Sequence, residues 1–189
     1  LTGLCPVYCR FCFRREMVGP GKAEALTHDQ LEAALRQMGA TSASFPPIVA
    51  VGSNAALPHY RPCETRRIGE DDFVLVDWGA DRAGYKSDLT RVLVTGKVTP
   101  KLQKVYRAVL QAQQRAIEAI RPGVKASEVD RTARRVLEDS GLDRYFEHGL
   151  GHGLGLEIHE APKLRKGVDD TLRAGMVITI EPGIYLRGW

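Results

Sequence analysis

The stretch Phe73-Val-Leu-Val-Asp-Trp-Gly79 decides the fold, together with the residues that follow it up to position 94. Residues 73–77 form a largely apolar run that is typical of a buried strand. Residues 79–84 have glycine at both ends and are typical of a turn. Residues 85–94 supply a second strand-like run. The sequence therefore predicts a β-hairpin over 73–94.

Each arm of this hairpin carries one aspartate, Asp77 or Asp88. If the turn centres on Arg82-Ala83, the two aspartates are directly opposed on one face, with Cβ atoms about 5 Å apart. Two carboxylates at that distance repel, and burying them among apolar residues costs free energy unless a cation is present. The pair favours a divalent metal site. Either aspartate alone is equally well explained as a turn cap or a solvent-facing residue, and another register would separate the two.

A glycine-rich segment, His148-Gly-Leu-Gly-His152-Gly-Leu-Gly-Leu-Glu-Ile-His159-Glu-Ala-Pro162, carries three histidines. So many glycines disfavour a helix and let backbone and ligands approach closely. If the segment is extended, His148 and His152 project to the same side. A single histidine is more often a satisfied core or surface residue than a ligand. Three within twelve positions, among glycines, favour a functional site.

Glu181 directly follows the apolar run Met176-Val-Ile-Thr-Ile180. A charge at the end of such a strand is costly unless it is paired or coordinated. With the two aspartates and a histidine, it makes a carboxylate-rich set with one imidazole. Such ligands suit two divalent ions of the manganese or cobalt type, with zinc or iron as alternatives.

The other segments alternate between helices and short strands. Apolar residues at helical spacing, between cap and stop signals, predict helices near 27–39, 100–121 and 127–140. The last of these begins at a capping box formed by Ser127 and Asp130. Strand-like runs lie at 45–51 and 176–180. The fold class is therefore α+β with antiparallel pairing.

Six motifs in order resemble those of the pita-bread (creatinase/aminopeptidase-like) metallopeptidases, in particular Xaa-Pro aminopeptidases and prolidases. They are Phe45-Pro-Pro-Ile-Val49, Asn54-Ala-Ala-Leu-Pro-His59, Leu75-Val-Asp-Trp-Gly79, Ser87-Asp-Leu-Thr-Arg91, His148 to Pro162, and Glu181-Pro-Gly-Ile-Tyr185. The resemblance covers about residues 38–189. It implies a pita-bread catalytic domain that removes the N-terminal residue from peptides with proline in second position, by means of a metal-bridged hydroxide.

The resemblance also implies a role for each matching residue. Asp77 would chelate one metal ion, Asp88 would bridge both ions, and His152 and Glu181 would bind the second. His59, His148 and His159 would position the substrate and stabilise the tetrahedral intermediate without binding metal. Manganese is the preferred metal.

The chain departs from the family pattern in two respects. The family has a fifth ligand, a bridging glutamate on a strand after the Glu-Pro-Gly motif, and this sequence ends at Trp189 before reaching it. The helices that precede the strand at Phe45 are missing or reduced. We therefore expect an incomplete domain that could be inactive, and a non-catalytic binding module on the same fold is an alternative.

A different motif opens the chain, Cys5-Pro-Val-Tyr-Cys9-Arg-Phe-Cys12. Three thiolates at this spacing can hold a 4Fe-4S cluster with one open iron. The motif and its flank resemble the cluster loop of radical S-adenosylmethionine enzymes related to lysine 2,3-aminomutase. Too few residues follow to build their barrel. We therefore expect two joined fragments, a radical-enzyme piece at 1–37 and an incomplete metallopeptidase domain at 38–189. Reduced, incidental cysteines are the alternative.

Composition limits the partners. The 27 basic and 23 acidic residues give a net charge of +4, too weak and scattered to indicate nucleic acid. No apolar run approaches the length of a membrane span, and the first residues lack the pattern of a secretory signal. We expect a cytoplasmic enzyme acting on a peptide substrate, with a homo-oligomer left open.

Overall fold

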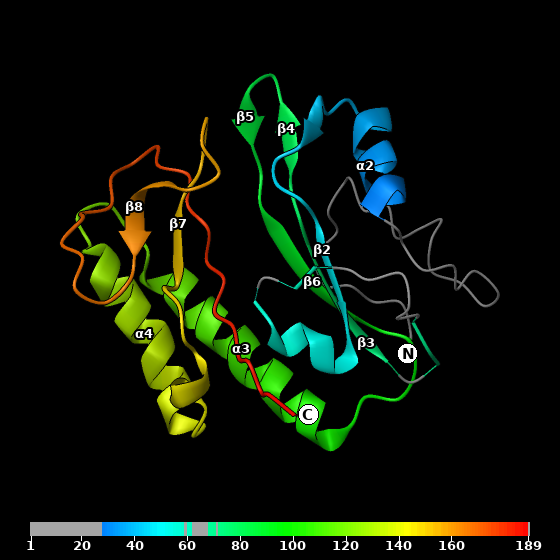
Figure 1. Ribbon diagram of the computed structural model, residues 1–189. Coiled ribbons are helices and arrows are strands. Elements are labelled where there is room, and N and C mark those ends of the chain that lie inside the picture. The colour runs from blue at the N-terminus through cyan, green and yellow to red at the C-terminus, as the bar shows by residue number, and fades with distance from the viewer. Residues whose placement is uncertain (1–27, 59, 62–67, 71, 189) are drawn as a thin grey trace.

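The computed structural model describes residues 28–58, 60–61, 68–70 and 72–188 (Figure 1). In this part of the chain, two antiparallel sheets and helix α2 come first, and helices α3 and α4 with a second hairpin follow. The α+β class with antiparallel pairing is confirmed. None of the described helices is long and apolar enough to cross a membrane.

The first layer is a three-stranded antiparallel sheet in the order β2 (Ile48–Val51), β3 (Phe73–Trp78), β6 (Leu89–Val94). Alternate residues of β3 are buried, as expected for a strand with one face on a core. Helix α2 (His28–Gln37) packs on this face, where its Leu31 is 1% exposed in a cluster with β2 and β3. Gly39 follows α2 with φ +92°, so the predicted helix and its stop are confirmed.

The hairpin predicted over 73–94 is present, but its register differs from the prediction. Its tip is formed by β4 (Ala80–Arg82) and β5 (Tyr85–Lys86), which pair beside β1 (Ser42–Ala43). The turn therefore centres on Ala83-Gly84, which both have positive φ, as the common two-residue hairpin turn requires. Asp77 consequently lies opposite Thr90, and the prediction that it directly opposes Asp88 is wrong.

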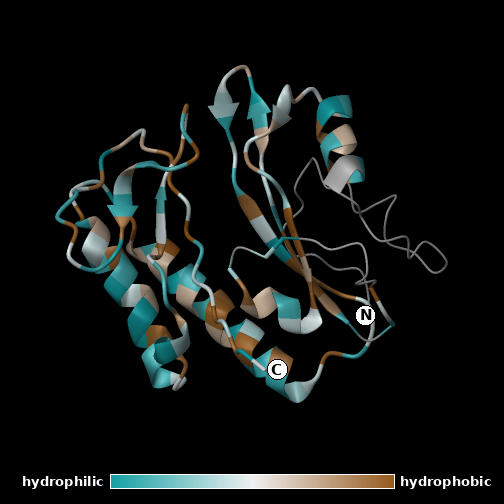
Figure 2. Cartoon of the chain, in the orientation of Figure 1, coloured by the Kyte–Doolittle hydropathy of each residue, from teal (hydrophilic) through white to brown (hydrophobic). Residues whose placement is uncertain are grey.

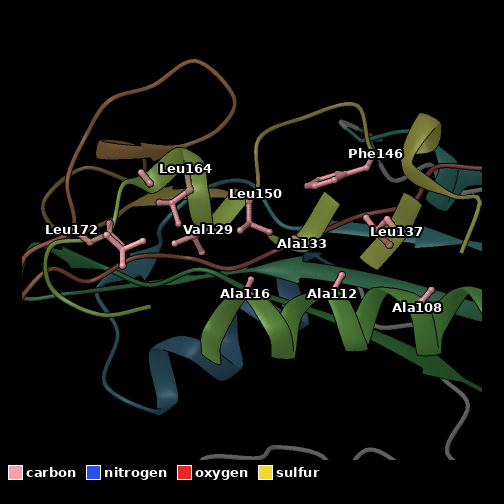
Figure 3. Packing of buried hydrophobic residues seen from close by; sticks show 12 residues of the cluster. Ala108, Ala112, Ala116, Val129, Ala133, Leu137, Phe146, Leu150, Leu164 and Leu172 are labelled. Atoms are coloured by element: carbon pink, nitrogen blue, oxygen red, sulfur yellow. The ribbon is translucent and has the colours of Figure 1, made fainter. Parts of the chain in front are cut away.

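The second layer holds helices α3 (Pro100–Ala119) and α4 (Ala126–Asp139) and a hairpin of β7 (Gly151–Gly153) and β8 (Glu160–Leu164). The alanines of α3 at four-residue spacing, Ala108, Ala112 and Ala116, are buried on one stripe. Their small side chains let α4 approach closely (Figure 3). Figure 2 shows hydrophobic stretches on the sheet strands and along part of α3, while much of α4 is hydrophilic.

Two local predictions in this layer are wrong. Helix α4 begins at Ala126 with Lys125 as its cap residue, so Ser127 lies inside the helix, and Asp130 is buried and bonded to Arg134. Residues 176–180 form no assigned strand. They run extended beside β7 and are bonded to it through Leu154 N to Val177 O and Thr179 N to His152 O. Two short 3-10 helices, η1 (Gly52–Ala56) and η2 (Asp143–Tyr145), complete the described elements.

Candidate metal centre

Asp77 and Asp88 lie on the same face of the sheet despite the change of register. A shift of two residues keeps each side chain on its original face, because side chains alternate with period two. Asp77 is the residue before the last in β3, and Asp88 lies in the short link between β5 and β6. Gly79 allows that link to approach, because a Cβ there would lie 1.8 Å from the carbonyl oxygen of Ser87.

Burial dominates the electrostatics of Asp77. Desolvation raises the pKa of its carboxyl to about 6, against a hydrogen bond from Thr90 Oγ1 at 3.0 Å that lowers it. The negative charges of Asp88 and Glu181 raise it further, while His152 acts in the opposite direction. Asp77 therefore lies close to the three other predicted ligands, in a position where a nearby cation would relieve an unfavourable charge.

The glycine-rich segment places His152 against two other extended segments. A Cβ on Gly151 would lie 2.1 Å from the carbonyl oxygen of Thr179, and one on Gly153 would lie 2.2 Å from that of Ala161. Only glycine fits these two positions, so β8 and residues 176–181 can both approach the backbone of β7 beside His152. The predicted close approach of backbone is confirmed, and the segment contributes both strands of a bulged hairpin.

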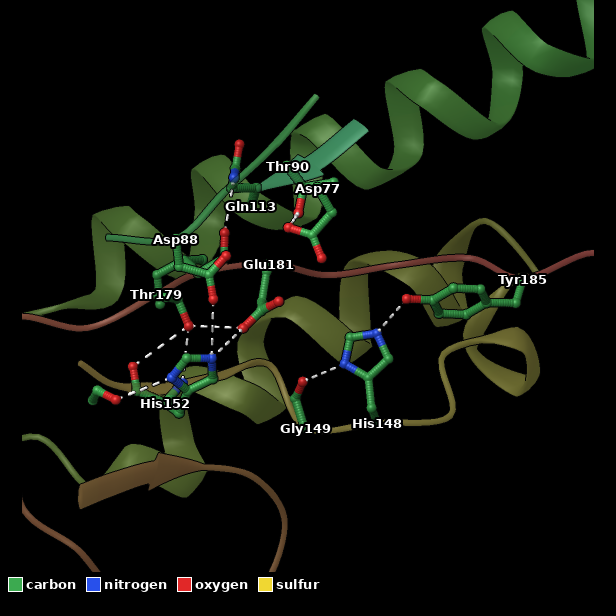
Figure 4. A network of polar contacts seen from close by, with 12 residues as sticks. Asp77, Asp88, Thr90, Gln113, His148, Gly149, His152, Thr179, Glu181 and Tyr185 are labelled. Carbon is green, nitrogen blue, oxygen red and sulfur yellow. Dashed lines mark hydrogen bonds and ion pairs between the residues drawn. The ribbon is translucent and has the colours of Figure 1, made fainter. Parts of the chain in front are cut away.

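His152, Glu181 and Asp88 converge in one cluster (Figure 4). The Nε2 atom of His152 lies 3.1 Å from Glu181 Oε1 and 3.5 Å from Asp88 Oδ2. Thr179 Oγ1 donates to Glu181 Oε1 at 2.8 Å and fixes that carboxylate. The three side chains come from the hairpin of residues 73–94, from β7 and from the extended segment after it.

The charges in this cluster are strongly coupled. Burial alone would lower the pKa of His152, but hydrogen bonds to the carboxylates of Asp88 and Glu181 outweigh it and raise the pKa to about 10. Burial alone would raise the pKa of Glu181, but hydrogen bonds from His152 and Thr179 lower it below its usual value. The protonated imidazole thus supplies the positive charge that two neighbouring carboxylates need.

The ligand atoms of these three residues fit a divalent cation. One atom from each of Asp88, His152 and Glu181 lies within 4.8 Å of the others. Oxygen ligands bind calcium or magnesium at about 2.0 to 2.6 Å, so two ligands on opposite sides of an ion are about 4 to 5 Å apart. Carboxylates with one imidazole suit manganese, iron, cobalt or zinc. The group could therefore hold a metal ion with little movement.

The other predicted site residues have different positions. His148 lies beside Glu181 and away from the imidazole of His152, with Nδ1 2.7 Å from Gly149 O and Nε2 3.0 Å from Tyr185 Oη (Figure 4). The ring of His159 contacts that of His152 edge-on, with centroids 4.3 Å apart. His59, Cys5, Cys9 and Cys12 lie outside the described residues. The roles of these residues stay predictions.

Several residues of the site were missed in the sequence. Thr90 and Thr179 each lie two positions from a carboxylate that belongs to the ligand set, Asp88 or Glu181, so alternation along an extended chain could have indicated them. Tyr185 was noted only as the end of a motif. Burial raises the pKa of its phenol to about 12, so it keeps its proton at neutral pH.

Comparison with known proteins gives consistent matches. Residues 7–189 match the model of metallopeptidase family M24. The chain is 43% identical over 171 residues to the Xaa-Pro dipeptidase of Pyrococcus furiosus, covering 90% of this chain and 49% of that protein. It is 41% identical over 175 residues to the Xaa-Pro dipeptidase of Lactobacillus delbrueckii subsp. lactis, covering 92% and 47%.

Solved structures agree with these sequences. The recombinant prolidase from Thermococcus sibiricus superposes with a TM-score of 0.84 at 43% identity, covering 89% of this chain and 47% of that one. The X-Pro aminopeptidase from Thermotoga maritima superposes with a TM-score of 0.82 at 37% identity, covering 85% of this chain and 46% of that one. The chain thus spans about half the length of the relatives it matches.

Proposed function

Because this chain belongs to metallopeptidase family M24, we propose that its metal centre serves hydrolysis of the peptide bond that precedes a proline, after the first residue of a peptide. The family membership and the likeness to solved prolidases confirm the predicted pita-bread fold. The chain is that of a metal-dependent peptidase. Its substrate, the number of metal ions and its activity as a separate chain belong to the proposal.

One observation carries the proposal, the convergence of Asp88, His152 and Glu181 to within 4.8 Å. Such a group is expensive to assemble without a ligand, because two carboxylates repel and all three side chains are at most one-third exposed. The protonated imidazole offsets this cost, and a divalent ion would offset it more strongly by binding the same atoms.

We propose two ions rather than one because Asp77 lies next to this group. The pKa of Asp77 is raised by burial and by the neighbouring charges of Asp88 and Glu181. A second ion beside Asp77 would lower this pKa again. Asp77 and Asp88 would hold one ion, and Asp88, His152 and Glu181 would hold the other. When bound, the ions would lower the pKa of a water and so supply a nucleophile at neutral pH.

Residues of the chain that bind no metal would orient the substrate. The carbonyl of Gly149 can only accept, so Nδ1 of a neutral His148 carries the proton and its Nε2 accepts from Tyr185. The raised pKa of Tyr185 keeps that phenol a donor. In this proposal His148, which lies near Glu181, and His159, which contacts the ring of His152, hold the substrate. The printed names of the relatives, Xaa-Pro dipeptidase and X-Pro aminopeptidase, support proline after the cleaved bond.

The test is hydrolysis of Ala-Pro and Ala-Pro-Ala by the purified chain with manganese, with Ala-Ala as a control substrate. The Xaa-Pro dipeptidase of Pyrococcus furiosus serves as the positive control. We expect the chain to cleave at least one of the two proline peptides. A chelator should abolish this cleavage, and the Asp88→Asn variant should not show it. Preference for Ala-Pro indicates a dipeptidase, and preference for Ala-Pro-Ala indicates an aminopeptidase.

Two results would count against this function. Cleavage of Ala-Ala as fast as Ala-Pro would refute the preference for proline. Binding of manganese without cleavage of any of the three peptides, while the positive control is active, would favour the non-catalytic binding module.

The cysteine motif at the start of the chain is a separate proposal. The family match begins at residue 7, inside the segment predicted to be a radical-enzyme fragment. Anaerobic reconstitution with iron and sulfide tests it. We expect a brown protein that loses its colour in Cys9→Ser, and a colourless wild-type protein would remove the cluster.

A further inference from the structure

We propose that Arg134 and Asp130 of α4 are positioning residues that fix the imidazole of His148 by holding the backbone of residues 146–150. The inference rests on the proposed function only where it gives His148 a role toward substrate. The contacts and the first test below are independent of that role.

Three backbone groups of the segment bind this one pair. Arg134 donates from Nη2 to the carbonyl of His148 at 2.6 Å and from Nη1 to the carbonyl of Phe146 at 3.0 Å. Asp130 Oδ1 accepts from the amide of Leu150 at 3.1 Å. Residues 146, 148 and 150 alternate along the chain, so this side of the segment faces α4.

The pair is itself rigid. Arg134 Nε lies 2.8 Å from Asp130 Oδ2, and Nη2 lies 3.2 Å from Oδ1, which is a two-point contact between planar groups. The Asp130 side chain is 1% exposed, and the guanidinium lies 4.3 Å from the ring centroid of Phe146. A buried ion pair is weak evidence for stability but can specify one geometry. Among the described residues, the other hydrogen bonds of the pair, to Phe146 O, His148 O and Leu150 N, go to the segment that carries His148.

The imidazole of His148 has three contacts, two of which come from that segment. The ring of Phe146 meets it edge-on, with centroids 5.0 Å apart and planes at 87°. Gly149 O accepts from Nδ1, and Tyr185 lies at Nε2. Phe146 and Gly149 are both in the clamped segment, so release of its carbonyls would free both contacts. His148 would then lose its preference for the tautomer with hydrogen on Nδ1.

The test is the ¹⁵N spectrum of the histidine side chains, recorded near pH 8 on the metal-free chain and assigned with His148→Asn. In the wild type we expect the Nδ1–H tautomer of His148 to dominate. In Arg134→Ala we expect a mixture of tautomers and broadened signals. Arg131→Ala is the matched control, since Arg131 lies on the same helix, is 60% exposed and pairs with Glu128 at 3.6 Å on its own helix.

Arg134→Lys covers the case in which Arg134→Ala does not fold. Lysine keeps the charge beside Asp130 but lacks the planar fork that reaches both carbonyls, so the same loss of tautomer is expected. Guanidinium ion at millimolar concentration should restore the wild-type spectrum in Arg134→Ala, because the Arg134 side chain is 30% exposed and its site is open to solvent. A wild-type His148 spectrum in whichever variant folds would overturn the proposal.

A kinetic measurement separates this inference from the proposed function. If the wild-type chain cleaves Ala-Pro, misplacing His148 should lower kcat by roughly 10- to 100-fold with little change in KM. Arg131→Ala should match the wild type. An unchanged kcat in Arg134→Lys would count against a positioning role. If the wild type is inactive, that failure belongs to the proposed function, and the spectrum still decides the role of Arg134.

Discussion

The protonation of His152 determines how the site takes up a cation. Its pKa is about 10, so at pH 7.5 the ring of the metal-free chain is protonated, whereas a metal ligand must be neutral. Binding should therefore release about one proton at pH 7.5, and affinity should rise about tenfold per pH unit up to pH 10. Below pH 6, protonated Asp77 should add a second proton and steepen the dependence. Calorimetry of manganese binding in buffers of different ionisation enthalpy measures this release.

A manganese affinity that stays constant between pH 7.5 and pH 10 would show that the neutral imidazole is already present in the metal-free chain. Binding enthalpies that do not vary with the buffer at pH 7.5 would give the same conclusion. The role of His152 in holding the two carboxylates together would then be wrong.

Substitution at Asp88 separates metal ligands from the other polar residues of the site. Asp88→Asn should weaken manganese binding by at least about 100-fold, because the proposed shared ligand loses its charge. His148→Ala should bind manganese with unchanged affinity, since its ring contacts Gly149 and Tyr185 instead. Asp169→Asn, whose side chain is 89% exposed, is the control for a lost surface charge. Equal affinities in the first two variants would contradict the assignment of roles.

At this scale the sequence indicated side chains that the structure brings together, but not the contacts that support them. Asp88, His152 and Glu181 were identifiable because each is a costly residue in its local pattern. Thr90 and Thr179 are common residue types in extended segments, so their two-residue spacing from Asp88 and Glu181 is a weak signal. Arg134 lies on a helix, and the sequence alone does not distinguish it from an arginine that simply faces solvent.

Helix and strand packing at β7 depends on its glycines. Gly151→Ala should cost about 1 to 3 kcal/mol of unfolding free energy, because the new Cβ would overlap the backbone carbonyl of Thr179, which cannot move alone. Gly155→Ala is the matched control. A Cβ there meets the carboxylate end of Glu160, a side chain that can rotate away. Urea denaturation monitored by circular dichroism measures both, and equal stabilities would show that β7 can separate from residues 176–181.

Element boundaries were predictable where a cap or stop was unambiguous. Gly39 ended α2, and Thr99 with Pro100 began α3, where Thr99 Oγ1 accepts from the amide of Leu102. The predicted hairpin register was wrong because Gly84 rather than Arg82 takes a central turn position with positive φ. The predicted capping box is not formed, because Asp130 is buried and bonded to Arg134 instead of to the start of the helix. The first error therefore came from turn geometry, and the second from the burial of Asp130.

On the scale of the whole molecule, the ligands join two separate hydrophobic clusters. Asp77 and Asp88 belong to the hairpin beside the cluster of β2 and β3, while His152 and Glu181 lie on segments packed against the cluster of α3 and α4. Bound metal should therefore oppose unfolding of the whole chain. At a free concentration 100 times Kd, one ion should add about 2.7 kcal/mol. Thermal unfolding with and without manganese measures this, and Asp88→Asn should show no gain.

The family was recognisable at this scale because six motifs agree in order over most of the chain. The match to family M24 and the TM-score of 0.84 confirm that inference. The three cysteines near the start have no equivalent support, because a short motif predicts chemistry only together with the fold around it. Their cluster stays a prediction.

The fit of Gly151 and Gly153 around His152 also has a genetic consequence. Every single-base change that alters the amino acid at a glycine codon introduces a Cβ, a longer side chain or a premature stop. No such mutation at these two codons can therefore preserve the backbone contacts on both sides of the histidine. Natural variation should consequently be far rarer at these codons than at that of Gly155, and inherited changes there should impair the protein even though glycine has no side chain to contribute to catalysis.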